Sequence, residues 1–191
     1  MLDDTLEDNE RIRYICKVMF EAFQIPVFVL DASQTIEHQL PMSFESRPLT
    51  KDTSRMLAEI INTVDDGGIS DNPSSLPIIR TTQFLENFII LRLPNEHLDA
   101  TTLVIGPSLY APLTEDNAAS LMRDNNIPLK LQDQWLQYYT SLTALNRMRL
   151  YHTAMLLYSL VTGKTLSITD LLLDTRTLEP TPHTSDSLDL N

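Results

Sequence analysis

The strongest constraint on the fold is a change of hydrophobic spacing at Pro26. In the segment 9–24, before this proline, apolar residues recur every three or four positions, which is typical of a helix with one buried face. Proline lacks a backbone N–H and restricts the residue before it, so the helix is expected to end there. Beyond it, short apolar runs on either side of the polar corner 31–34 predict two strands joined by a turn.

A second helix and three more strands are predicted between residues 51 and 110. The segment 51–66 has helical spacing, and the loop after it contains two glycines and a proline. The segments 76–82, 83–94 and 101–110 are rich in β-forming residues. Because short loops join neighbouring antiparallel strands, these three strands are expected to form a meander.

From Pro112 onward the hydrophobic pattern is helical. Thr114 is expected to cap the first of these helices, because its hydroxyl can accept from free backbone N–H groups and acidic residues follow it. The segments 129–142 and 145–163 are amphipathic, and Gly163 suits a helix C-terminus. The short connection between these two segments predicts a helical hairpin.

The order of elements predicts an α+β fold: a central antiparallel sheet of about five strands, flanked by helices, with a C-terminal helical hairpin. Residues 1–173 are expected to form one domain, with an α/β core at 8–112 and C-terminal helices at 113–163. Residues 174–191 lose the hydrophobic periodicity and are rich in Pro, Ser, Thr and Asp, which is typical of a flexible tail or linker.

Composition argues against several classes of function. The chain of 191 residues has 14 basic and 26 acidic residues, a net charge of -12, so its surface should repel a nucleic acid. The acidic N-terminus is unlike a secretory signal, and the most apolar stretch, 154–161, is far shorter than the roughly 20 residues of a membrane-spanning helix. The single cysteine cannot form an intrachain disulfide. We therefore expect a soluble, cytoplasmic protein without a membrane partner.

The sequence contains no motif typical of catalysis or of cofactor binding. The four glycines do not form a phosphate-binding loop, and the four histidines are isolated rather than paired at metal-ligand spacing. Cys16 could be a nucleophile or a redox sensor, but a cysteine on an apolar helical stripe is more often a small buried hydrophobe. We therefore expect a protein that is not an enzyme, with no catalytic residue, no cofactor and no metal.

Two corner motifs lie around the last strand and the C-terminal helices. They are "IGP" at 105–107 and "IPLK" at 127–130, each followed by a helical segment. In this order, residues 104–164 resemble the sensory half of certain AraC-family transcription regulators of Gram-positive bacteria. The segment 23–36 is similar to the first strand pair of these regulators, so the resemblance spans about residues 10–165.

The resemblance implies a PAS/GAF-like fold, in which the antiparallel sheet binds a ligand or partner on one face and terminal helices carry the output. It also implies that DNA is bound only by a pair of helix-turn-helix modules, which would lie beyond Asn191 and are absent from this chain. The segment from about Thr175 is where a linker to such modules would lie.

A ligand pocket on the sheet is expected to combine apolar walls with a few polar side chains. Arginines are the most informative candidates, because an arginine that faces inward needs an anionic partner, either a carboxylate or a ligand. The apolar candidates could equally be ordinary core residues. The predicted pocket residues are Phe28, Leu30, Arg80, Phe88, Ile90, Arg92 and Tyr110.

The final long helix is expected to offer a second surface. Tyr151, Met155 and Tyr158 could pair with a second copy of the chain, although each could also belong to the core. The hypothesis is therefore a signal-sensing and dimerisation domain of an AraC-type regulator, with a small-molecule effector and a homodimer as its partners. The alternatives are a stand-alone, non-enzymatic protein-interaction domain of the same fold and, third, a small hydrolase.

Overall fold

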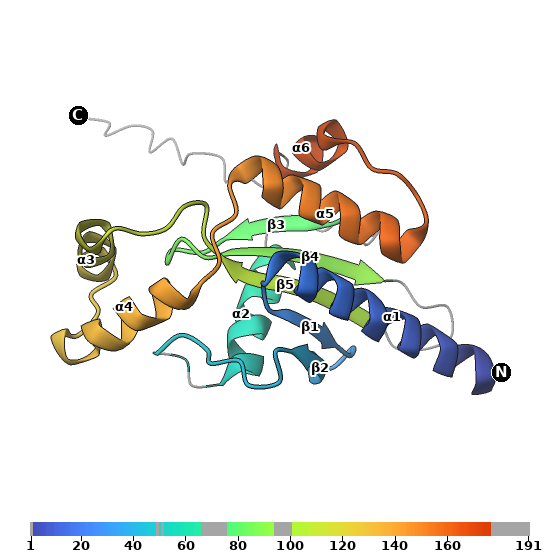
Figure 1. Cartoon of the computed structure of the whole chain (residues 1–191), viewed down its shortest axis with the longest axis horizontal. Helices are drawn as coiled ribbons and strands as arrows, with labels where there is room; N and C mark the ends of the chain where they lie inside the picture. Colours follow the sequence, from blue (N-terminus) through green and yellow to red (C-terminus); the bar gives the residue numbers. More distant parts are fainter. Residues whose placement is uncertain (1, 49, 51, 66–75, 94–100, 177–191) are drawn as a thin grey trace, which may run out of the picture.

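The structure is a computed structural model that describes residues 2–48, 50, 52–65, 76–93 and 101–176. The elements shown in Figure 1 follow the chain in the order α1 (Leu2–Phe23), β1 (Val27–Leu30), β2 (Ile36–Leu40), α2 (Thr53–Asp65), β3 (Ile78–Thr81), β4 (Asn87–Leu93), β5 (Thr101–Ser108), α3 (Glu115–Asp124), the 3-10 helix η1 (Leu129–Leu131), α4 (Gln132–Ser141), α5 (Arg147–Thr162) and α6 (Ile168–Arg176). The predicted α+β fold class is confirmed.

The five strands form one antiparallel sheet with the order β2-β1-β5-β4-β3. The strands β3, β4 and β5 pair in succession, so the predicted meander is confirmed. The strand β1 pairs with β2 on one side and with β5 on the other. The first strand pair therefore adjoins the meander through β5, and α2 carries the chain from one edge of the sheet to the other (Figure 1).

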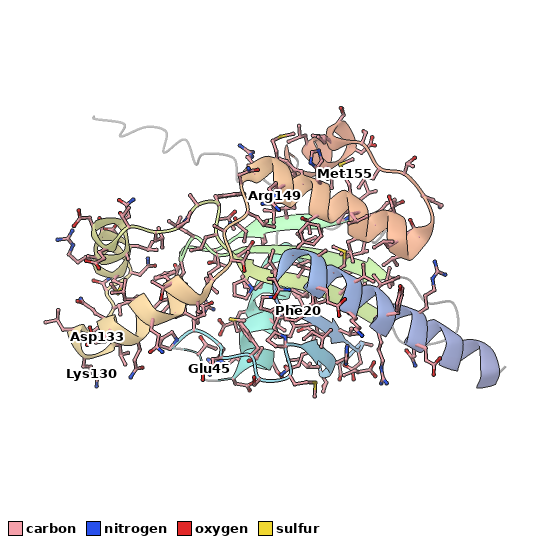
Figure 2. All side chains as sticks on the ribbon, viewed as in Figure 1. Phe20, Glu45, Lys130, Asp133, Arg149 and Met155 are labelled. Atoms are coloured by element: carbon pink, nitrogen blue, oxygen red, sulfur yellow. The ribbon has the colours of Figure 1, made fainter. Side chains whose placement is uncertain are left out.

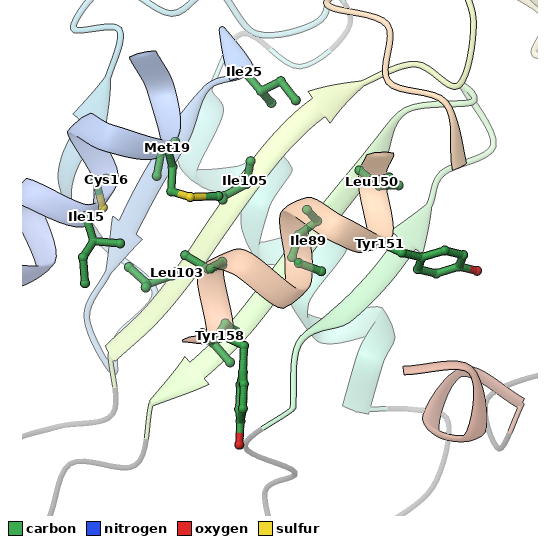
Figure 3. Packing of buried hydrophobic residues seen from close by; sticks show 14 of the residues in the cluster. Ile15, Cys16, Met19, Ile25, Ile89, Leu103, Ile105, Leu150, Tyr151 and Tyr158 are labelled. Atoms are coloured by element: carbon green, nitrogen blue, oxygen red, sulfur yellow. The ribbon is translucent and has the colours of Figure 1, made fainter. Parts of the chain in front are cut away.

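The helices α1 and α5 cover one face of the sheet (Figure 1). Side chains alternate between the two faces along a strand, and Ile89, Leu103 and Ile105 point to this one. Figure 3 shows Met19 of α1 and Leu150 of α5 packed over these strand residues. This first cluster also includes Leu171 of α6. Packing of these apolar faces on the sheet is expected to supply most of the stability of both helices.

The opposite face of the sheet packs against α2 and against Phe44 of the connector between β2 and α2. Phe28, Phe88 and Val104 point to this face and contact Met56 and Ile60 of α2. The members of this second cluster are fully or almost fully buried, so no gap separates the middle of the sheet from the helix. The second cluster is therefore a closed core layer.

A third cluster lies beyond one end of the sheet, around Trp135 of α4. It joins Phe84, from the turn between β3 and β4, to apolar residues of α3 and α4. Figure 1 shows α3 and α4 together at this end of the molecule. The position of this cluster explains why the C-terminal helices do not all pack on the sheet.

The predicted helical hairpin of residues 129–142 and 145–163 is not observed. The helix α4 packs on α3, whereas α5 packs on α1 and the sheet. The cause is the extended segment between them: Leu109 donates to the carbonyl of Thr143 at 3.0 Å, and Leu145 donates to the carbonyl of Leu109 at 2.7 Å. These two hydrogen bonds hold the connection against the end of β5 and send the helices in different directions.

Two predicted helix ends are confirmed. Thr114 accepts a hydrogen bond from the N–H of Asn117 at 3.3 Å, and Gly163 ends α5 with a φ of 71°. Two boundaries differ from the prediction. The helix α1 begins at Leu2 rather than near residue 8, and α6 runs to Arg176, past the expected end of the domain at 173. Most of the predicted tail, 177–191, lies outside the described residues.

We expect Gly106→Ala to destabilise the fold more than Gly163→Ala. Gly106 has a φ of 147°, and a Cβ there would lie 2.6 Å from Cδ1 of Phe88 and 2.7 Å from the carbonyl oxygen of Asn87. The strain and the overlap should lower the free energy of unfolding by about 2–4 kcal/mol. Gly163 also has a positive φ but no neighbour within 4 Å, so its substitution should cost about 1 kcal/mol.

Urea unfolding of the two variants and of the parent chain measures this difference. Equal losses in both variants would contradict the close packing of β5 against β4 at Gly106.

Candidate ligand-binding site

A cavity of about 430 Å³ lies where the connector between β2 and α2 meets α2 and the turn between β3 and β4. We call it the first cavity. Its walls carry charged, hydroxyl, amide and aromatic groups from three separate parts of the chain. The lining residues are Arg47, Thr50, Glu59, Ile60, Arg80, Thr81, Thr82, Gln83 and Phe84.

Arg47 is a buried cation in the wall of the first cavity, with a side chain only 7% exposed. Its Nη1 lies 3.2 Å from Oε2 of Glu86, and its Nη2 lies 3.5 Å from Oε2 of Glu59. Its Nε donates to Oγ1 of Thr50 at 3.3 Å. Its Cζ lies 4.8 Å from the centre of the Phe84 ring, within the range of a cation–π contact. These contacts compensate a charge that is costly to bury alone.

Glu86 is the anionic partner of Arg47 and is completely buried. Its Oε2 accepts from Arg47 and, at 2.9 Å, from Oγ1 of Thr82. Its Oε1 accepts from the hydroxyl of Tyr138 at 2.6 Å, a short distance typical of a hydrogen bond to a carboxylate. The connector, the β3–β4 turn and α4 therefore meet at one carboxylate.

Two neighbouring tyrosines of α4 remain protonated in this environment. Burial, and after it the negative charge of Glu86, holds the pKa of Tyr138 well above its usual value. The same causes raise the pKa of Tyr139. Tyr139 donates to the backbone carbonyl of Phe84 at 3.3 Å, while Tyr138 donates to Glu86. Both phenols therefore act as hydrogen-bond donors that fix α4 to the β3–β4 turn.

Glu59 of α2 marks the open edge of the first cavity, with a side chain 52% exposed. Besides its contact with Arg47, its Oε1 lies 3.3 Å from Nε of Arg55, one helical turn earlier. An exposed pair of this kind contributes little to stability. Glu59 therefore bridges two guanidinium groups but is bound loosely to both.

An aromatic stack continues from the first cavity into the third cluster. The ring of Phe84 faces the Arg47 guanidinium and is also stacked on Trp135, with ring centres 4.9 Å apart. Trp135 is the only tryptophan of the chain and is fully buried. Its Nε1 has no hydrogen-bond partner among the described residues. A molecule in the cavity that displaced Phe84 would therefore change the surroundings of the Trp135 indole directly.

Six of the seven predicted pocket residues lie on the α2 face of the sheet. Arg80 is in register with Phe88, and directly paired residues point to the same face, so both face α2. Of these six, Arg80 lines the first cavity. Arg92 lies further along β4, paired with Thr102, and is partly exposed. The four apolar residues are buried in the second cluster: Phe28, Leu30, Phe88 and Ile90.

The seventh predicted pocket residue, Tyr110, lies apart from the others. It follows β5, is 38% exposed, and its hydroxyl lies 3.4 Å from Oγ1 of Thr81. Thr81 also lines the first cavity, whereas Tyr110 itself does not. The predicted pocket residues are therefore divided between a closed core layer, the wall of the first cavity and positions outside both.

The predicted dimer residues lie mainly in the core of the chain itself. Tyr151 and Tyr158 are each 7% exposed and belong to the first cluster, as Figure 3 shows. Met155 packs partly buried against the same cluster, and Figure 2 shows it on α5. On this helix the larger exposed apolar side chains are Met148 and Leu156. The structure thus gives the two tyrosines the core role that the sequence also allowed.

A second cavity, of about 360 Å³, lies where the C-terminal end of α1 meets the connector and the segment after α4. Figure 2 labels two of its lining residues, Phe20 and Glu45. Prolines, serines and a threonine form most of its remaining wall, and none of the predicted site residues lines it. In contrast to the first cavity, its lining contains no arginine.

In the described part of the chain, no three or more His, Cys, Asp or Glu side chains are grouped closely enough to hold a metal ion. Over the same residues, no helix combines the length and the apolar character needed to cross a membrane. Comparisons with protein-family models, with curated proteins and with solved structures find no match to this chain.

Sequence reasoning singled out Arg80 but missed Arg47, Glu59 and Glu86. Glu86 had a signal, because it is a charge two positions before the apolar run 88–91, and a charge that is carried into a core needs a partner. Arg47 had none, since it stands in a connector without hydrophobic periodicity. Its role arises from long-range contacts, 39 residues away in the case of Glu86.

We expect the thiol of Cys16 to be unreactive in the folded chain. It is completely buried in the first cluster, and this burial raises its pKa to about 12. The thiolate is the reactive form, so at pH 8 labelling by an aromatic disulfide reagent should be roughly a hundredfold or more slower than in urea. Rapid stoichiometric labelling of the folded chain at pH 8 would instead revive the redox-sensor interpretation.

We expect Tyr138→Phe to cost more stability than Tyr139→Phe. The first substitution removes a donor to a buried carboxylate and should lower the free energy of unfolding by about 2 kcal/mol. The second removes a longer hydrogen bond to a neutral carbonyl and should cost about 1 kcal/mol or less. Denaturant unfolding compares the two variants, which are matched in chemistry and adjacent in sequence. A reversed order would show that Glu86 is not held by Tyr138.

Proposed function

We propose that this chain is a signal-sensing domain that binds a small polar molecule in the first cavity and is not an enzyme. One observation carries the proposal: the cavity is lined by Arg47, which is also bound to the buried carboxylate that holds α4 in place. A ligand in this cavity would touch groups that organise a different part of the fold. That is the arrangement a sensor requires, because binding must alter an element beyond the site.

The size and lining of the first cavity support a small-molecule ligand. A volume of about 430 Å³ is within the range of about 300–1,000 Å³ common for ligand pockets. The wall offers guanidinium, hydroxyl and amide donors beside an aromatic ring. Such a mixture orients a polar ligand, while Phe84 and Ile60 supply apolar surface.

Within this proposal, the domain belongs to a cytoplasmic transcription regulator of the AraC type and functions as a homodimer. The resemblance of residues 104–164 supports that assignment. A net charge of -12 is unfavourable for contact with DNA, so DNA binding is assigned to a separate basic helix-turn-helix region. In this regulator the domain would supply ligand detection, and the change at α4 would supply the output.

A thermal-shift screen with sugars, nucleotides and organic acids tests the proposal. A ligand at 100 times its dissociation constant should raise the melting temperature by about 5–10 °C, because it stabilises the folded state by about 2.7 kcal/mol. Gln83→Tyr, which places a bulky ring on an exposed lining residue, should reduce this shift. Gln137→Tyr makes the same change on an exposed residue of α4 outside the lining and should leave it intact.

A screen without any shift would contradict ligand sensing and favour the alternative, a protein-interaction domain of the same fold. A shift that both variants retain equally would place the ligand elsewhere in the chain.

A further inference from the structure

We infer that the first cavity is a site for a small anion, a carboxylate or a phosphate group, and that Glu59 takes the place of this anion when no ligand is bound. The inference rests on the proposed function, because it names the chemical class of ligand for the same cavity. Three features of the described residues carry it: the donors in the wall, the two unequal contacts of Arg47, and the second partner of Glu59.

The wall of the first cavity is rich in donors, although the chain as a whole is strongly acidic. Two guanidinium groups, from Arg47 and Arg80, line it together with threonine hydroxyls and the amide of Gln83. The one carboxylate in the lining is Glu59. Guanidinium groups bind carboxylates and phosphates through paired, charge-assisted hydrogen bonds. In a chain of net charge -12, this local concentration of cationic donors suits an anion.

The two carboxylates that contact Arg47 differ in how firmly they are held. Glu86 is fully buried, lies 3.2 Å from Arg47 and accepts from two further donors, so its removal would leave an uncompensated buried charge. Glu59 is half exposed and lies 3.5 Å from Arg47. An incoming anion therefore replaces Glu59 rather than Glu86, because only the Glu59 contact can be exchanged at little cost.

Glu59 keeps a partner when an anion takes its place. Its other oxygen lies 3.3 Å from Nε of Arg55, which is also on α2 and is largely exposed. The displaced carboxylate would remain next to Arg55 and in contact with water. The exchange thus leaves no buried carboxylate without a donor, and it leaves the Arg47–Glu86 pair intact.

A cationic ligand suits the same position poorly. It would meet the Arg47 guanidinium, which is 7% exposed and cannot move into water without leaving Glu86. Like charges at a partly desolvated site repel strongly. A neutral ligand could use the hydroxyl and amide groups but would leave the exchange between Glu59 and ligand without a driving force.

Titration with inorganic phosphate and, separately, with succinate tests the inference at constant ionic strength maintained with sodium chloride. The emission of Trp135 is the readout, because Phe84 contacts both the cavity and the indole. Equilibrium dialysis with radiolabelled phosphate or succinate measures binding independently of fluorescence. The comparison of the two probes identifies whether the site prefers a phosphate or a carboxylate.

Three substitutions give the expected pattern. Arg80→Gln should weaken binding of the preferred anion about tenfold or more, because a charge-assisted contact is lost. Glu59→Gln should strengthen it about threefold to tenfold, since the competing charge is removed. Arg92→Gln is the matched control: it removes an arginine from the same face of the sheet but outside the lining, and it should change affinity less than twofold.

Saturable binding with this order of affinities supports the inference. It is overturned if neither anion binds the parent chain, or if Arg80→Gln and Arg92→Gln weaken binding equally. Arg80→Lys keeps the charge but loses the paired N–H donors of the guanidinium, so it should give an intermediate affinity. This variant keeps the test valid if Arg80→Gln fails to fold. If an uncharged or cationic compound shifts the melting temperature while neither anion binds, the sensing proposal survives and the anion inference fails.

Discussion

The buried carboxylate of Glu86 is the constraint on which this end of the molecule depends. A charge with no exposure to water is costly by several kcal/mol unless donors surround it. Its donors come from three segments: Arg47 before α2, Thr82 in the β3–β4 turn, and Tyr138 on α4. If any of these segments moved away, the carboxylate would lose a donor. These contacts therefore fix α4, through Tyr138, to the connector and the β3–β4 turn, which form part of the wall of the first cavity.

The fold could be predicted to the extent that it follows from local spacing. Period-two and period-3.6 patterns specify which segments are strands and helices, and Pro26, Thr114 and Gly163 mark their ends by local chemistry. The separation of α4 from α5 could not be predicted this way. It depends on hydrogen bonds between Leu109 and the segment 143–145, which are contacts between backbone groups that any residues could make. Hydrophobic periodicity carries no information about them.

The site could be predicted only in part, for a related reason. The alternation of β3 and β4 places Arg80 and Arg92 on the same face of the sheet, where both are partly exposed. The same alternation places Phe28 and Phe88 on that face too, but α2 covers both and they are fully buried. The first cavity lies at the β3–β4 turn, where large apolar side chains no longer fill the space beside the sheet. A cavity at that edge needs a second wall, and the connector that supplies Arg47 has no pattern to reveal it.

Arg47 contacts two carboxylates, Glu86 firmly and Glu59 loosely. The firm contact contributes to stability, and the loose contact is the one that a ligand can exchange. The Arg47–Glu86 contact is closed to water, and breaking it would leave a buried charge without its partner, so it is the costlier of the two contacts for a ligand to change. The Arg47–Glu59 contact is open to water and loosely held, so it can exchange without endangering the fold. In the proposed sensor, the first response to a ligand is therefore a change at Glu59 and α2. Because Phe84 contacts both Arg47 and Trp135, a shift of its ring would extend this change to α4.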